Sequence, residues 1–111
     1  MTFFRFFLGF IALAVIVYTI PVIQNEGLLA LFPSFFGEIL NMSWQGQFNT
    51  DFLAFLLLSA FWTCWRNSFS LQGVLLGIGA FFLGAPYLAF YLIYLSYVCK
   101  GDIESMLLGD K

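Results

Sequence analysis

Few side chains in this chain have the types and spacing that chemistry needs. Asp51 comes immediately before a short apolar run, and Tyr87, Tyr91 and Tyr94 recur on one face of a predicted helix. A carboxylate near phenol hydroxyls could bind a cation or a proton, and stacked tyrosines could hold a lipid, a quinone or a pigment. The alternatives are a hydrated carboxylate at a helix start and tyrosines of an interfacial belt. We treat these four residues as candidate buried polar or ligand contacts.

Other kinds of chemistry have little support in the sequence. The chain contains no histidine, which removes the commonest metal ligand and the side chain that titrates most readily near neutral pH. The carboxylates do not recur at metal-ligand spacing, and no lysine lies inside an apolar segment. We therefore expect no catalytic residue, no metal site and no cofactor, and we expect that the protein is not an enzyme.

A second pattern consists of small residues. Gly73, Gly77, Ala80 and Gly84 are spaced i, i+4, i+7 and i+11, so they line one face of a helix. Two helices can approach closely along such a face, because backbone meets backbone. The pattern predicts a helix-packing interface, either within the chain or with another subunit.

The composition indicates the solvent in which these helices lie. The chain has 111 residues, of which 62% are hydrophobic, 22% aromatic and 9% charged. A soluble domain is typically about 45–50% apolar and about 25% charged. Ten charged side chains cannot coat the surface of such a domain, and a net charge of −2 leaves no basic stripe for nucleic acid. We predict an integral membrane protein with the lipid bilayer as partner, and we exclude soluble enzymes, disordered tails and nucleic-acid binders.

The apolar segments predict an all-α fold, a single transmembrane domain over residues 1–111. We expect three membrane spans at about 3–23, 48–66 and 71–98. A signal peptide is the alternative for the first segment. An amphipathic helix is expected between the first two spans, at about 28–43, in the interface; a hydrophobic loop over the helix ends is the alternative.

Two of these segments have unusual lengths. The apolar part of the second is short, so the span must extend back to Phe48, with Thr50 as its N-cap and Asp51 in its first turn. The third is roughly 42 Å long at about 1.5 Å per residue, which exceeds a hydrocarbon core of about 30 Å. It must tilt, kink or protrude, and Pro86 is the predicted site of the kink.

The charges predict a multi-pass protein with a cytoplasmic N-terminus and a C-terminus outside. In this orientation Arg5 and Arg66 lie inside, with no acidic residue near them. It also puts Cys64 and Cys99 roughly a bilayer apart, which excludes a disulfide between them.

Three stretches of the sequence resemble a known family: Tyr-Thr-Ile-Pro at 18–21, Phe-Asn-Thr-Asp-Phe at 48–52, and Leu-Gly-Ala-Pro-Tyr-Leu-Ala-Phe-Tyr-Leu at 83–92. The chain is similar, over most of its length, to small bacterial and cyanobacterial three-span membrane proteins catalogued as a domain of unknown function. The resemblance implies a three-helix membrane fold, and it assigns no activity. Asp51 and Pro86 match recurring polar and proline positions of that family.

The small-residue face and the scarcity of reactive groups predict a structural role. We expect an accessory subunit of a larger membrane complex or a homo-oligomer, located in a bacterial inner membrane. The alternative is a binder or carrier of a small apolar ligand, or a proton-linked small transporter, with Asp51 and the tyrosines as its polar contacts.

Overall fold

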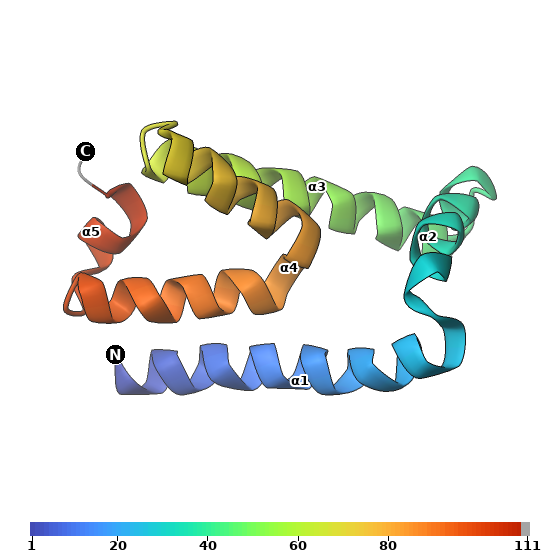
Figure 1. Cartoon of the computed structure of the whole chain (residues 1–111), viewed down its shortest axis with the longest axis horizontal. Coiled ribbons are helices and arrows are strands. Elements are labelled where there is room, and N and C mark those ends of the chain that lie inside the picture. Colours follow the sequence, from blue (N-terminus) through green and yellow to red (C-terminus); the bar gives the residue numbers. More distant parts are fainter. Residues whose placement is uncertain (110–111) are drawn as a thin grey trace.

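The computed structural model describes residues 1–109, and every regular element in this range is a helix. The expected all-α class is therefore confirmed. Residues 110 and 111 of the predicted domain lie outside the described residues. In chain order the elements are α1 (Thr2–Glu26), the short 3-10 helix η1 (Leu28–Ala30), α2 (Leu31–Leu40), α3 (Trp44–Arg66), α4 (Leu71–Val98) and α5 (Ile103–Leu108) (Figure 1).

The two helices α1 and α3 run the length of the molecule in opposite directions, and α2 crosses between them (Figure 1). The Cα atoms extend 44 Å along this axis and 28 and 23 Å across it. We call the end that carries α2 the distal end. The opposite end, where α1 begins and α3 finishes, is the terminal end.

By length and composition, two helices among the described residues could cross a membrane, α1 and α4. An unbroken apolar sequence explains α1, in which Arg5 is the only charge before Glu26. Pro21 lies inside α1 without ending it. The helix α3, which contains the span expected at 48–66, is not among these candidates, because its first two turns are polar.

The helix α3 begins earlier than predicted. Ser43 is its N-cap, since the Oγ atom accepts a hydrogen bond from the backbone N–H of Gly46 at 3.0 Å. Thr50 lies inside the helix and donates its hydroxyl to the carbonyl oxygen of Gly46 at 2.9 Å. The predicted N-cap at Thr50 is therefore wrong, and Asp51 is not in the first turn.

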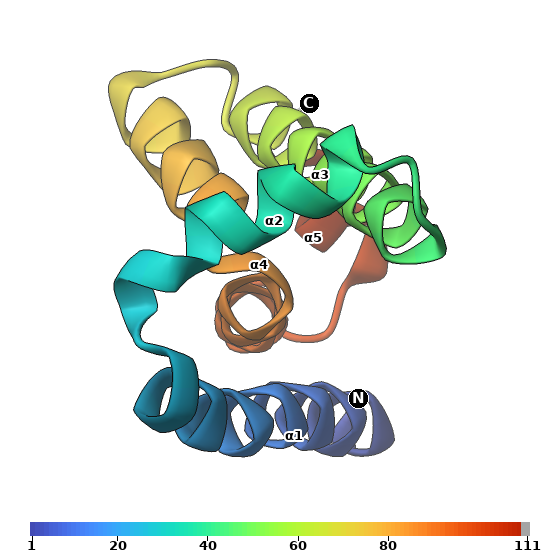
Figure 2. The same cartoon turned by 90° about the vertical axis from the view of Figure 1, so that its right-hand side faces the viewer.

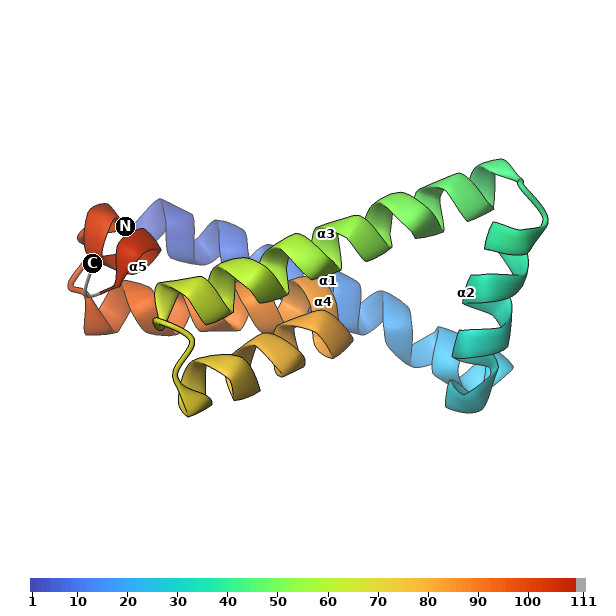
Figure 3. The ribbon, with the colours of Figure 1, turned by 90° about the horizontal axis from the view of Figure 1, so that it is seen from above.

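The segment predicted to lie in the interface folds as η1 followed by α2. The two helices meet at Leu31, and Pro33 lies in the first turn of α2, where a missing N–H removes no helical hydrogen bond. Asn49 fastens this segment to α3, because its Nδ2 donates to the carbonyl oxygen of Phe35 at 3.0 Å. As a result α2 lies across the distal end rather than along the long axis (Figure 3).

A tight connection joins α3 to α4. Ser68 and Phe69 have positive φ values of 57° and 54°, and the N–H of Phe69 donates to the carbonyl oxygen of Cys64 at 2.8 Å. Ser70 then caps α4 by accepting from the N–H of Gly73 at 3.1 Å. The first half of α4 consequently lies antiparallel to α3, as the short connection predicts.

The second half of α4 turns back toward the terminal end (Figures 1 and 3). Gly84 has φ 70° and ψ −144°, a conformation that is close to exclusive to glycine. The bend is centred on this residue, and Pro86, the predicted kink, follows it by two positions. Figure 2, which looks down the long axis, shows the second half between α1 and the pair formed by α3 and the first half. The segment expected as the third span therefore consists of two half-helices that start and finish at the same end of the molecule.

Because α4 folds back, the N-terminus and the last described residues lie at the same end of the molecule rather than at opposite ends as predicted. Arg5 donates from Nε to the Oγ of Ser96 at 2.8 Å, and a Cβ atom on Gly101 would lie 3.0 Å from Cγ of Met1. The prediction that Cys64 and Cys99 lie roughly a bilayer apart is therefore wrong as well. Cys99 Sγ lies 3.7 Å from the Nη2 of Arg66, the second residue after Cys64, so both cysteines lie at the terminal end.

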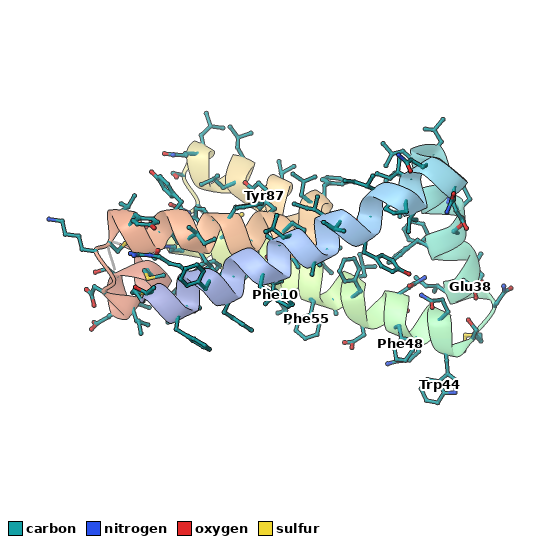
Figure 4. All side chains as sticks on the ribbon, turned by 90° about the horizontal axis from the view of Figure 1, so that it is seen from below. Phe10, Glu38, Trp44, Phe48, Phe55 and Tyr87 are labelled. Atoms are coloured by element: carbon teal, nitrogen blue, oxygen red, sulfur yellow. The ribbon has the colours of Figure 1, made fainter. Side chains whose placement is uncertain are left out.

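The buried core is small, and most large apolar side chains face outward. One cluster joins α1 to the second half of α4 through Leu8, Ala12 and Ala89. A second cluster joins both halves of α4 to α3 and α5 around Tyr91, Leu95 and Met106. No phenylalanine among the described residues is buried. Figure 4 shows Phe10 on α1 and Phe48 and Phe55 on α3 projecting away from the bundle.

Candidate functional site

The small-residue face of α4 is occupied within the chain. Gly73, Gly77 and Ala80 are all buried. A Cβ atom on Gly77 would collide with Sγ of Cys64 and would lie 3.0 Å from the carbonyl oxygen of Ala60. Gly77 thus packs against α3 within the chain, which is one of the two arrangements that the small-residue pattern leaves open. Gly84, the fourth member, forms the bend, where it lies beside Phe52 and Leu56 of α3.

The three tyrosines have three different surroundings, so they do not form one column. Tyr91 is buried, and its hydroxyl accepts a hydrogen bond from the Nδ2 of Asn67 at 2.9 Å. Tyr87 is half-buried beside Gly79, and Tyr94 is 61% exposed. Only Tyr91 is the buried polar contact that the sequence predicts, and its partner is an amide of α3 rather than Asp51.

Asp51 is exposed on the side of α3, two turns from the start of the helix. It lines a shallow groove of about 500 Å³ between α3 and the end of α2, together with Ser43, Gln47 and Thr50. The surrounding polar side chains are consistent with a hydrated carboxylate. This placement does not provide the buried site that was predicted for Asp51.

Two arginines hold the terminal end together, and no sequence pattern predicts either role. Arg5 donates from Nη2 to the carbonyl oxygen of Ser96 at 3.1 Å, and its guanidinium lies 3.8 Å from the centroid of the Tyr97 ring. Arg66 donates from Nε to the carbonyl oxygen of Met106 at 2.5 Å, which ties α5 to the end of α3. The available signal was that each arginine adjoins an apolar segment in which it needs acceptors.

A cavity of about 440 Å³ lies at the distal end, between the end of α1, the η1–α2 segment and the start of α3. No sequence pattern predicted it, because its walls come from three separate elements. We call it the distal cavity. Its polar lining residues are Thr19, Glu26, Ser34, Glu38, Gln45 and Asn49.

The two ends of the molecule therefore differ in chemistry. At the terminal end, arginine side chains satisfy backbone carbonyls and join the start of α1 to α4 and the end of α3 to α5. At the distal end, two carboxylates line a cavity. Comparison of the chain with protein-family models, with curated proteins and with solved structures found no match. The resemblance to a three-span family accordingly stays a prediction.

Proposed function

We propose that this chain is an integral membrane protein that acts as a structural or accessory subunit, bound to another membrane protein or to further copies of itself. The observation that carries the proposal is the outward orientation of its phenylalanines, of which Phe3 is 83% and Phe10 is 71% exposed. Soluble monomers rarely expose large contiguous apolar surfaces. In a bilayer the same surface is in contact with lipid or with another membrane helix.

The dimensions support a placement in which α1 and α3 cross the membrane. The 44 Å extent of the molecule matches the roughly 40–45 Å thickness of a bilayer with its headgroups. Each half of α4 is roughly 20 Å long at about 1.5 Å per residue, so α4 enters and leaves at the same face. Its bend has protein beside it, since a Cβ atom on Gly84 would lie 3.6 Å from Phe52 and 3.7 Å from Leu56. Irregular backbone at membrane depth needs such cover.

The charges favour a cytoplasmic terminal end. The described Lys and Arg residues, Arg5, Arg66 and Lys100, all lie at this end, together with Asp102 and Glu104, whereas the distal end carries the carboxylates Glu26 and Glu38 without a described Lys or Arg. The positive-inside rule places the end that is rich in Lys and Arg in the cytoplasm. We therefore propose that both termini are cytoplasmic, which keeps the predicted N-terminus and replaces the predicted C-terminus. The bacterial inner membrane remains the proposed location on the strength of the family resemblance.

A partner is most readily accommodated on α1. The small-residue face is already used within the chain, and α1 contacts the rest of the protein mainly through its first half and α4. From Leu13 to Glu26 every residue of α1 is exposed. This leaves a long apolar helix face for another membrane helix.

Photo-crosslinking in native membranes tests the accessory role. A photoreactive residue in place of Leu13, which is 61% exposed on α1, should capture a protein partner. The same residue in place of Ile78, which is 51% exposed on α4, is the matched control and should capture lipid only. Native mass measurement in mild detergent should give a species heavier than 12.6 kDa. A stable 12.6-kDa monomer without protein crosslinks at position 13 would contradict the proposal.

The alternative role, binding of a small apolar ligand, is supported by a separate observation. The distal cavity has a size within the usual range for ligand sites, about 300–1,000 Å³.

A further inference from the structure

We propose that the distal cavity binds an amphiphile that has an ammonium head and an apolar chain. The inference rests on the proposed membrane placement, because such a molecule reaches the cavity from the bilayer. Figure 4 shows Glu38 at the distal end, beside the start of α3 marked by Trp44. Glu26 enters the same cavity from the end of α1.

The charge of the cavity is unbalanced within the described chain. Glu26 and Glu38 both line it, and no Lys or Arg is among its lining residues. Arg5 lies on the same helix as Glu26 but 21 positions earlier, which is roughly 31 Å at about 1.5 Å per residue. Glu38 receives one neutral hydrogen bond, from the Oγ of Ser43 to Oε2 at 2.9 Å. A positively charged occupant would supply the missing counter-charge.

Three of the four side chains that line the cavity and can donate hydrogen bonds, those of Thr19, Gln45 and Asn49, donate within the protein, and Ser34 is the fourth. Asn49 donates to the carbonyl oxygen of Phe35 at 3.0 Å, and Nε2 of Gln45 donates to Oδ1 of Asn49 at 2.9 Å. The hydroxyl of Thr19 donates to the carbonyl oxygen of Val15 at 2.7 Å. The carboxylates, by contrast, are acceptors only. The polar part of the cavity thus complements a cation or a donor, and it disfavours an anion.

Two apolar grooves continue from the distal cavity toward the bend of α4. Phe35 and Leu31 line both the cavity and a groove of about 140 Å³ whose far wall includes Phe81. Thr19 and Ile23 line both the cavity and a groove of about 460 Å³. That second groove extends along α1 to Leu83, Pro86, Tyr87 and Phe90.

The fold explains why these grooves exist. Because α4 turns back at Gly84, its two halves fill only the half of the bundle near the terminal end (Figure 1). An apolar chain lying in the grooves would cover apolar side chains there, while its head would lie beside the carboxylates. An anionic amphiphile would meet repulsion from Glu26 and Glu38, and a small hydrophilic cation would make no use of the grooves. The two carboxylates and the apolar grooves together therefore favour an ammonium amphiphile over both of these ligands.

Glycine resonances provide a direct test on the whole chain. Gly27 lines the distal cavity, and Gly101 lies at the terminal end, so their ¹⁵N–H signals report the two ends separately. In neutral maltoside micelles, decyltrimethylammonium should shift the Gly27 signal saturably and leave Gly101 nearly unchanged. Decyl sulfate, which has the same chain and an anionic head, should not produce the saturable shift. Equal shifts at both glycines, or equal shifts with both surfactants, would overturn the inference.

Substitution of the carboxylates identifies the head site. The double variant Glu26→Gln/Glu38→Gln should bind decyltrimethylammonium at least about tenfold more weakly, which corresponds to about 1.4 kcal/mol. Glu104→Gln removes an exposed carboxylate at the terminal end and should bind as the wild type does. Retention of the wild-type affinity by the double variant would refute the proposed head site. An unchanged dispersion of the other glycine signals would show that the double variant is folded.

A comparison of lipids distinguishes a bilayer lipid from a free amphiphile as the natural occupant. Binding is measured in nanodiscs of phosphatidylethanolamine and of phosphatidylglycerol with the same acyl chains. Weaker surfactant binding in phosphatidylethanolamine would show that a lipid ammonium headgroup competes for the cavity, and equal binding would indicate a free amphiphile. The crosslinking result at position 13 is independent of this measurement, so the accessory role and the amphiphile site can fail separately.

Discussion

Replacement of Gly46 by alanine is expected to release α2 from α3. The Cβ atom would collide with the carbonyl oxygen of Glu38 and would lie 2.8 Å from its carbonyl carbon and 3.0 Å from Cα of Ile39. These atoms are backbone, so no side-chain rotation relieves the contact, and α2 has to move as a unit. We expect a loss of about 2–3 kcal/mol in the docking of α2, as is typical of overpacking. Amide hydrogen exchange in α2 should therefore accelerate about 30- to 160-fold.

A matched control is available on α2 itself. A Cβ atom on Gly37 would meet no atom within 4 Å, so Gly37→Ala should leave exchange unchanged or slow it slightly through better helix propensity. Amides of α4, such as that of Leu95, should exchange at the wild-type rate in both variants. If Gly46→Ala and Gly37→Ala behaved alike, the close approach of α2 to α3 would be contradicted.

The double substitution Gly84→Ala/Pro86→Ala is expected to straighten part of the α4 population. Alanine is favoured in a helix interior by about 1 kcal/mol over glycine and by about 3 kcal/mol over proline. Alanine at position 84 also disfavours the observed φ of 70° by about 1–3 kcal/mol. The contacts of the second half with α1 oppose the change, so we expect two populations. In the straight population residue 100 lies at the distal end.

Distance measurement between spin labels separates these two states. The labels are attached through Thr2→Cys and Lys100→Cys, with Cys64 and Cys99 replaced by serine. The wild-type background should give one short distance, because both positions lie at the terminal end. The double variant should add a distance of roughly 40 Å, the length of a straight α4. Pro86→Ala alone, which keeps Gly84, should retain the short distance. A single short distance in the double variant would show that Gly84 and Pro86 do not determine the bend.

The extents of the long helices could be read from the sequence, whereas their path could not. The apolar run that predicts a span at 3–23 corresponds to α1, and 71–98 matches the bounds of α4. The bend was assigned to Pro86 because proline disrupts a helix locally. The positive φ of Gly84, however, depends on the packing of both halves of α4 against their neighbours. Excess length was the available signal, since a helix longer than the bilayer can also fold back.

The start of α3 was missed for a local reason. Thr50 and Ser43 both precede helical sequence. The N-cap is the residue that has extended backbone dihedrals and whose side chain accepts a hydrogen bond from the backbone N–H two or three positions later. Ser43 has ψ 170° and accepts from the N–H of Gly46, whereas Thr50 lies inside the helix and donates to the carbonyl oxygen of Gly46. The distal cavity could not be predicted from the sequence either, because Glu26 and Glu38 line the same cavity only when α1, α2 and α3 are packed together.

The central claim is that α4 is a re-entrant helix pair which leaves both termini on one side of the membrane. Accessibility of single cysteines to a membrane-impermeant maleimide tests it most directly. Three positions are compared in a Cys64→Ser/Cys99→Ser background: Thr2→Cys, Lys100→Cys, and Met42→Cys at the distal end, where Met42 is 90% exposed. The account predicts that positions 2 and 100 are labelled from the cytoplasmic side and position 42 from the other side. Labelling of positions 42 and 100 from the same side, with position 2 opposite, would contradict it.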